Sequence, residues 1–267
     1  MRAWWWLLLT GCTQFSFEKQ DPPTPGPDDG RNPDTAPPEA ICGVQPDPAA
    51  PLNPVTWLGE NSFDPDGNPL VAWRWTLVDR PEGSSAVLPG GAANVEGFVP
   101  DLAGDYTATL VVTDDYGNPS APCATTLTAT PVEGLYVELT WAFGGEDLDL
   151  YAIPADSTEE SDACSAAGCS TDWASPGDPS DDPILVQSDI DGTGPEVIAI
   201  ERPDEDVEVL LGAVDRAPPF RSADNTATLR VWLAGQLAWE GSKTFSDELQ
   251  NKPFLRINPV TAEKTEL

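Results

Sequence analysis

The chain has 267 residues, with 13 Lys and Arg against 45 Asp and Glu, which gives a formal net charge of -32. Such a surface repels phosphate backbones and anionic membranes, which argues against nucleic-acid binding. The sequence has no histidine, so it lacks the usual general base of serine and cysteine nucleophiles and the commonest ligand of zinc, copper and iron. Any bound metal is therefore expected to prefer oxygen ligands. The excess of acidic residues is explained equally well by high solubility, by adaptation to a salty medium or by a calcium-related role.

The first twelve residues, MRAWWWLLLTGC, combine a positive charge at Arg2 with an apolar block that is too short to span a bilayer. The closing Leu-Thr-Gly-Cys resembles a bacterial lipobox, in which signal peptidase cuts before a lipid-modified cysteine. The resemblance implies a lipid anchor on Cys12 and a place in the cell envelope, expected at the outer membrane and facing the periplasm or the surface. The alternative is a buried strand at the start of a domain.

Residues 13–40 are rich in Pro, Asp and Gly, and from residue 18 onward they include no aromatic residue and no aliphatic one larger than alanine. Such a segment cannot bury enough apolar surface to offset the entropy of ordering. We therefore expect a disordered, extended tether between the lipid anchor and the first domain.

Four cysteines remain after Cys12, namely Cys42, Cys123, Cys164 and Cys169. An even number in an exported chain predicts disulfides, for which three pairings are open. The layout favours Cys42 with Cys123, which would clamp the two ends of one domain, and Cys164 with Cys169, which would close a small loop. A free catalytic thiol is disfavoured because no histidine could activate it.

Residues 41–131 show the period-two alternation of half-buried strands, separated by turn signals at 64–69, 88–91 and 114–119. No helical period occurs in this region. The buried faces are predicted to carry Val71, Trp73, Trp75 and Leu77 on one strand, and Tyr106, Ala108, Leu110 and Val112 on another.

These motifs, in this order, resemble a polycystic-kidney-disease (PKD) domain, an immunoglobulin-like sandwich of cell surfaces. The resemblance covers 41–131 and implies a spacer or adhesive module, although the common Trp-Asp-Phe-Gly-Asp-Gly run is missing. Asp64 and Asp66 could contact a cation, but turn capping explains them more simply. The residues that carry the resemblance are Ser62, Asp64, Asp66, Gly67, Trp75, Pro81, Glu82, Gly83, Ser84, Gly104, Tyr106, Val112 and Asp114.

Residues 132–267 are predicted to form a second antiparallel sandwich, so the fold class is all-β with two β-sandwich domains in tandem. Leu135, Val137, Leu139 and Trp141 should share a buried face, and Ala234-Gly235 has the character of a tight hairpin turn. Further strands are expected at 147–153, 184–189, 197–201, 207–214, 227–233 and 236–241.

This half also resembles an uncharacterised β-sandwich domain of secreted bacterial proteins, over about 133–241. The matching elements are DLDL at 147–150, the Cys164–Cys169 pair followed by Asp172-Trp173, DIDGTGPE at 189–196 and the hairpin around RVWLAGQLAWE. The resemblance implies a fold and a cellular location but supplies no activity.

Acidic residues recur in two places of the second half. Asp147 and Asp149 share one strand face, roughly 6.8 Å apart along the strand, and DIDGTG places Asp189 and Asp191 at calcium-loop spacing. Position twelve of that loop is Ile200 and flanking helices are missing, so it is not an EF-hand. We predict that one calcium ion is held by Asp147, Asp149, Asp189, Asp191 and Glu196. The alternative is a plain turn whose acids face water.

The sequence predicts a non-enzymatic cell-envelope lipoprotein that acts as a surface adhesion or ligand-binding module. Its expected partners are the membrane, through the N-terminal lipid only, and a glycan or protein ligand. Two alternatives stay open: a purely structural surface spacer, and a glycoside hydrolase that uses Asp147 and Asp149 as its paired carboxylates. Neighbouring acids on one strand match poorly with two groups that must flank a substrate bond.

Overall fold

The computed structural model describes residues 33–145, 147–157, 159–169, 171–190, 192–216, 224–246 and 250–267. Within these residues the secondary structure consists of β-strands β1 to β16 and one short 3₁₀ helix, which confirms the predicted all-β class. No helix in the described part of the chain is long and apolar enough to cross a membrane. The compact unit runs from Asp34 to Leu267.

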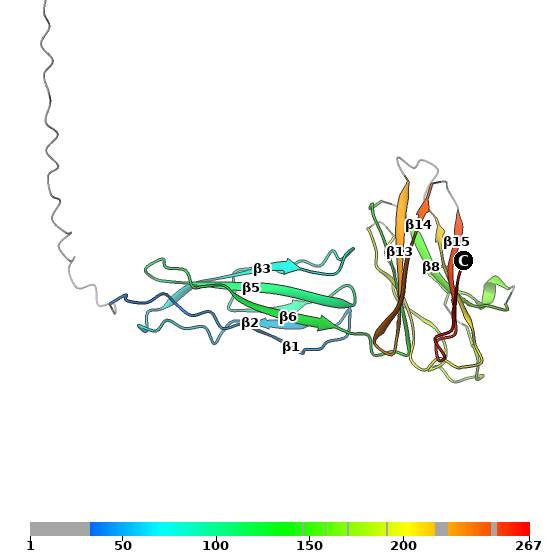
Figure 1. Cartoon of the computed structure of the whole chain (residues 1–267), viewed down its shortest axis with the longest axis horizontal. Helices are drawn as coiled ribbons and strands as arrows, with labels where there is room; N and C mark the ends of the chain where they lie inside the picture. Colours follow the sequence, from blue (N-terminus) through cyan, green and yellow to red (C-terminus); the bar gives the residue numbers. More distant parts are fainter. Residues whose placement is uncertain are drawn as a thin grey trace, which may run out of the picture. The chain divides into compact units, whose positions relative to one another are not determined.

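The first sandwich packs two antiparallel sheets, with strand orders β1-β2-β4 and β3-β5-β6 (Figure 1). Trp57 and Tyr106 are fully buried between them, and Phe98 makes edge-to-face contacts with both rings at 5.6 Å. Such aromatic contacts add to the apolar burial that holds the sheets together. The strands are β1 (Gly43–Gln45), β2 (Val55–Leu58), β3 (Leu70–Asp79), β4 (Asn94–Phe98), β5 (Gly104–Asp114) and β6 (Cys123–Ala129).

The predicted alternation holds along β5 and fails at one position of β3. Val71 was expected in the core but is 59% exposed. The pairing of β3 with β5 shifts register between Leu70 and Ala72, and such a bulge reverses the faces beyond it. Leu70 therefore packs against the core in place of Val71. The residues that face the core as predicted are Trp73, Trp75, Leu77, Tyr106, Ala108, Leu110 and Val112.

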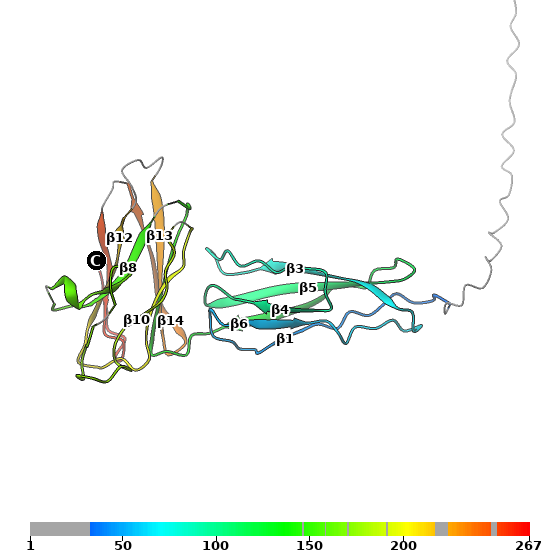
Figure 2. The ribbon, with the colours of Figure 1, turned by 180° about the vertical axis from the view of Figure 1, so that it is seen from behind.

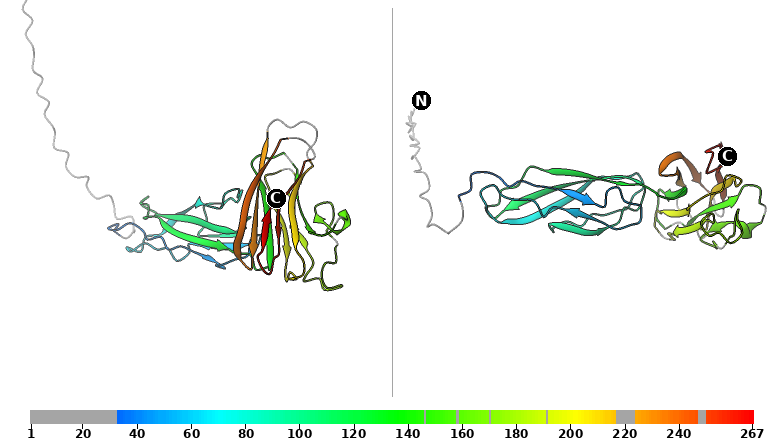
Figure 3. Two further views of the ribbon diagram at one scale, coloured as in Figure 1. Left: turned by 45° about the vertical axis from the view of Figure 1, so that its right-hand side comes forward. Right: turned by 90° about the horizontal axis from the view of Figure 1, so that it is seen from below.

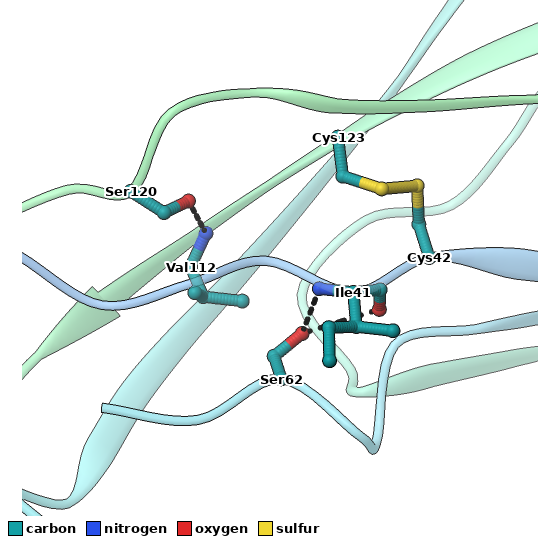
Figure 4. The surroundings of a disulfide bond; sticks show 6 residues. All are labelled: Ile41, Cys42, Ser62, Val112, Ser120 and Cys123. Carbon is teal, nitrogen blue, oxygen red and sulfur yellow. Dashed lines mark hydrogen bonds between the residues drawn. A yellow bond between two sulfur atoms is a disulfide. The ribbon is translucent and has the colours of Figure 1, made fainter. Parts of the chain in front are cut away.

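A disulfide joins Cys42 to Cys123 across the first sandwich, as the layout predicted. It links the residue before β1 to the first residue of β6, so it connects the two sheets. Figure 4 shows how this end is held: Ser62 Oγ accepts the Ile41 N–H at 3.0 Å, and Ser120 Oγ accepts the Val112 N–H at 3.0 Å.

Two loops at one end of the first sandwich are built alike. Asp64 Oδ1 accepts the N–H groups of Asp66 and Asn68, and Asp114 Oδ1 accepts those of Tyr116 and Asn118. A carboxylate that binds backbone groups two and four residues ahead is a turn cap, which supports the turn-capping interpretation of Asp64.

Described residues that precede the predicted domain start at residue 41 also contact the first sandwich. Asp66 accepts hydrogen bonds from the N–H groups of Thr35 and Ala36, at 2.6 and 2.8 Å. Glu39 also pairs with Phe63 in an antiparallel bridge. The last residues of the predicted tether, from Asp34, are therefore attached to the first sandwich.

The second sandwich has sheets of strand order β10-β11-β7-β13-β14 and β16-β15-β12-β8-β9 (Figures 1 and 3). Its core contains Phe245, Phe254 and many aliphatic residues with almost no exposure. The strands are β7 (Leu135–Trp141), β8 (Leu148–Pro154), β9 (Cys164–Ser165), β10 (Ile184–Gln187), β11 (Glu196–Ile200), β12 (Val209–Asp215), β13 (Asn225–Leu233), β14 (Gln236–Phe245), β15 (Asn251–Ile257) and β16 (Lys264–Glu266).

The central strand β7 differs from the prediction of a half-buried strand. Its inward residues lie in the core as expected, but Tyr136, Glu138 and Thr140 on the other face are buried too. Burial on both faces is typical of a strand that is covered on both sides, and period two alone cannot reveal it.

The predicted hairpin between β13 and β14 is confirmed. Leu233 pairs with Gln236, and Ala234 and Gly235 both have positive φ, of 46° and 78°. Two consecutive left-handed residues are the signature of a type I′ turn, whose twist suits a two-residue hairpin.

Candidate functional site

Figure 2 labels β8 and β12, which are neighbours in one sheet of the second sandwich. The outer face of this sheet carries a groove of about 860 Å³. The floor of the groove is formed by outward-facing residues of the two strands, because side chains along a strand point alternately into the core and away from it. Leu148, Leu150 and Ala152 of β8 are core residues. The residues between and beyond them line the groove, together with their neighbours on β12. This lining consists of Asp149, Tyr151, Ile153, Leu210 and Val214.

One wall of the groove is closed by the second disulfide, Cys164–Cys169, which confirms the other predicted pairing. Ser165, Ala167 and Gly168 line the groove from inside this small loop. Ser165 and Gly168 also exchange backbone hydrogen bonds at 2.9 and 3.1 Å. The covalent link and the backbone pair together leave this wall little freedom.

The wall continues with Ser157, Ser161 and Ala163. The 3₁₀ helix Glu160–Asp162 is visible as a short coil outside the sandwich in Figures 1 and 3. Ser157 donates to Asp162 at 2.6 Å, and the indole N–H of Trp173 donates to the Asp162 carbonyl at 3.0 Å. Trp173 is buried against the core, so it fastens this segment to the sandwich.

Tyr151 lies across the floor of the groove. Its partner on β12 is Gly212, where an added Cβ would stand 2.2 Å from the Tyr151 hydroxyl and 2.3 Å from the ring carbon that bears it. A glycine inside a strand often marks such a close approach. The hydroxyl donates to Asn251 Oδ1 of β15 at 2.9 Å. The hydroxyl end of the ring is therefore held against β12 and β15, and burial raises the pKa of Tyr151 to about 12.

Asp149 and Arg216 form an ion pair at one end of the groove, with Nε to Oδ2 at 3.1 Å. Asp149 is 6% exposed, while the Arg216 side chain is 41% exposed. Arg216 is also bound through its backbone, since its N–H donates to the Asp147 carbonyl at 2.7 Å. From the sequence, Arg216 was not expected to neutralise both acidic pairs, and in the structure it pairs with Asp149.

Glu196, a predicted calcium ligand, is fully buried and connects the two sheets. Its Oε2 accepts the Leu150 N–H of β8 at 2.6 Å, and its Oε1 accepts the Ser188 hydroxyl at 2.8 Å. Burial, more than any other cause, raises the pKa of Glu196 to about 7. Both carboxyl oxygens thus have protein partners.

Asp189 organises the loop that the sequence singled out. Its two oxygens accept the N–H groups of Gly192 and Gly194, both at 2.8 Å. An added Cβ on Gly192 would lie 2.2 Å from Asp189 Oδ2, and Gly194 has φ +89° with no room beside the Leu139 carbonyl. These contacts explain both glycines of DIDGTG and support the turn interpretation of the loop.

The charges of neighbouring acids act on the carboxyl group of Asp147. Its pKa is raised, first by burial, then by the charge of Asp149 and to a lesser degree by that of Asp189, while Arg216 lowers it. The structure therefore brings together Asp147, Asp149, Asp189 and Glu196, whereas Asp191 lies outside the described residues. Among those described residues, no group of three or more acidic or cysteine side chains is arranged to hold a metal ion.

The calcium site stays a prediction, and thermal unfolding checks it. If calcium binds only the folded state, a hundredfold excess over its Kd should stabilise the protein by about 2.7 kcal/mol, and a chelator should reverse the shift. Asp191→Asn should reduce the shift, and Asp156→Asn, at an exposed acid outside the cluster, should not. Unfolding that is indifferent to calcium would mean that DIDGTG forms only a turn.

Comparisons with known proteins leave the family of this chain open. No family model matches the sequence, and no curated protein matches it. Among solved structures, one similar chain comes from a study entitled "Structural basis for the promiscuous specificity of the carbohydrate-binding modules from the beta-sandwich super family". It shares 11% identity at a TM-score of 0.29, covering 83% of this chain and 84% of that one. A similarity this distant carries no information about function.

Proposed function

We propose that this chain is a non-enzymatic ligand-binding protein and that its C-terminal sandwich binds the ligand in the groove over β8 and β12. The observation that carries the proposal is the groove itself. At about 860 Å³ it falls in the size range of small-molecule sites, and it combines apolar side chains with a few polar groups, as such sites do. Its floor is a β-sheet and its wall is disulfide-linked, so the site is preformed.

The charge arrangement supports binding over catalysis. A glycoside hydrolase needs one carboxyl group as acid and a second as nucleophile or base, on either side of the bond to be cleaved. Asp149 is engaged by Arg216, and Asp147 is its near neighbour on the same strand segment. A charge-paired carboxylate of this kind is suited to accepting hydrogen bonds from a ligand.

The location of the protein follows in part from its disulfides. Two disulfides are typical of an extracellular or periplasmic protein. Our proposal adds a lipid anchor on Cys12, which lies outside the described residues, and a spacer role for the PKD-like first sandwich. Both additions rest on the sequence resemblances alone.

A groove-filling variant tests the proposed function without assuming what the ligand is. Val214→Trp should place an indole in the groove and weaken ligand binding by at least about tenfold, which corresponds to about 1.4 kcal/mol. Ile184→Trp is the matched control, because Ile184 is 55% exposed and lies on β10 of the other sheet. Binding is measured by calorimetry, with ligands found by screening glycans and peptides against the purified full chain.

The proposed function predicts that Val214→Trp loses binding while its unfolding temperature stays close to that of Ile184→Trp. Equal binding by both variants would contradict the groove as the site. A screen in which no glycan or peptide binds the unmodified chain would contradict the function and favour the structural spacer.

A further inference from the structure

The groove also has features that select a ligand class. Resting on the proposed function, we infer that it binds a neutral oligosaccharide, with one sugar ring lying on Tyr151 and its hydroxyls bonded by the Asp149–Arg216 pair.

The position of Tyr151 provides an apolar platform. The ring lies across Gly212, which leaves no side chain between it and the β12 backbone. The hydroxyl is tied to Asn251, so the ring cannot turn away without losing that hydrogen bond. Because Tyr151 also lines the groove, a ligand there meets a fixed aromatic ring. A sugar ring offers a matching surface, since its C–H groups on one face are apolar while its hydroxyls point outward.

The polar groups at the end of the groove suit hydroxyl groups. A hydroxyl both donates and accepts, and here a carboxylate acceptor stands beside a guanidinium with five N–H donors, one of which goes to Asp149. Hydrogen bonds to ionised groups are the stronger kind. Neighbouring hydroxyls of one sugar can therefore bind the acceptor and the donor of the pair together.

The balance of charge excludes an acidic ligand. Among the residues that the structure describes, the charged ones lining the groove are Asp149 and Arg216, one of each sign and paired with each other. A uronate or sulfate would find its cation already neutralised, in a chain whose net charge is -32. Repulsion over the whole molecule would then oppose the approach of an anionic glycan.

Around Tyr151 the floor of the groove does not offer a sheet edge to an extended peptide. β12 is bonded to β15 and β8, while β8 is bonded to β12 along its length and to β9 at Tyr151 and Ala152. Peptides that add a strand need the free backbone groups of a sheet edge. Recognition on this floor must come from side chains, which again favours a ligand that stacks and bonds through hydroxyls.

Titration of the full chain with neutral oligosaccharides, uronate-containing oligosaccharides and peptides tests the inference. Tyr151→Ala should weaken binding of the neutral ligand by about tenfold, the loss expected for an aromatic contact. Tyr151→Phe keeps the ring and should retain most of the affinity. Tyr116→Ala, at a tyrosine in a turn of the first sandwich that is 41% exposed, is the matched control and should bind normally.

The ion pair is tested by a change of specificity. Asp149→Asn keeps the shape of the side chain but removes the carboxylate charge that pairs with Arg216. The variant should lose affinity for the neutral ligand and gain affinity for uronate-containing oligosaccharides. If the unmodified chain binds peptides or acidic glycans in the groove, as judged by Val214→Trp, this inference is wrong and the proposed function stands. If the groove binds nothing, both fail.

Discussion

Replacing both Cys42 and Cys123 by alanine is expected to lower the free energy of unfolding of the first sandwich by about 4 to 5 kcal/mol. These cysteines are 81 residues apart in the sequence. A crosslink between distant residues restricts the unfolded chain strongly, and the stabilisation grows with the logarithm of the closed loop. A domain of ordinary stability has only about 5 to 15 kcal/mol in total, so this loss would bring the sandwich close to unfolding at 37 °C.

The second disulfide supplies the control. Cys164 and Cys169 are 5 residues apart, and the same relation gives only about 2 kcal/mol for so short a loop. Urea unfolding of the two double variants, followed by tryptophan fluorescence, would measure both losses. Equal losses, or a larger loss for the short loop, would show that loop length does not determine the stabilisation here. The short-loop variant should instead affect ligand binding, because its loop forms a wall of the groove.

The parts of the fold that could be predicted from the sequence depend on the alternation of apolar and polar residues along strands and on the positions of the cysteines. The inward faces of β5 and β7, the turn at Ala234-Gly235 and both disulfides are as expected. Val71 was misplaced because a bulge depends on how two strands pair, and no local pattern records that. The buried outer face of β7 was missed for a related reason, since burial on both faces depends on what covers the sheet.

The candidate site was predicted only in part. Asp149 was singled out, yet for a metal and not for the groove that it lines. Alternation along β8 also places Tyr151 on the same face as Asp149, and Gly212 inside a strand is a sign of a close approach. To predict that Tyr151, Gly212 and Asn251 lie side by side, one would need to know the order of β8, β12 and β15 in the sheet. Strand order is set by long-range packing, which a single sequence does not state.

Glu196 makes the stability of the second sandwich depend on pH in the direction opposite to ordinary acid unfolding. An ordinary glutamate has a pKa near 4.5, and burial raises that of Glu196 to about 7. Between these values the folded state holds a proton that the unfolded state has lost, so stability falls as pH rises. The contribution is fully present below about pH 4.5 and is lost as pH passes 7. Burial also raises the pKa of Glu138 to about 7, which adds a slope of the same sign.

Glu196→Gln should therefore flatten the pH profile. Glutamine keeps an acceptor for the Leu150 N–H and a polar partner for Ser188, but it cannot ionise in the buried site. The unmodified chain should lose up to about 3 kcal/mol more than the variant between pH 5 and pH 8, since one pKa unit corresponds to about 1.4 kcal/mol. Urea unfolding at the two pH values measures the difference. Glu263→Gln, at an exposed glutamate, should leave the profile unchanged, and a Glu196→Gln profile as steep as the unmodified one would show that Glu196 is not the titrating group.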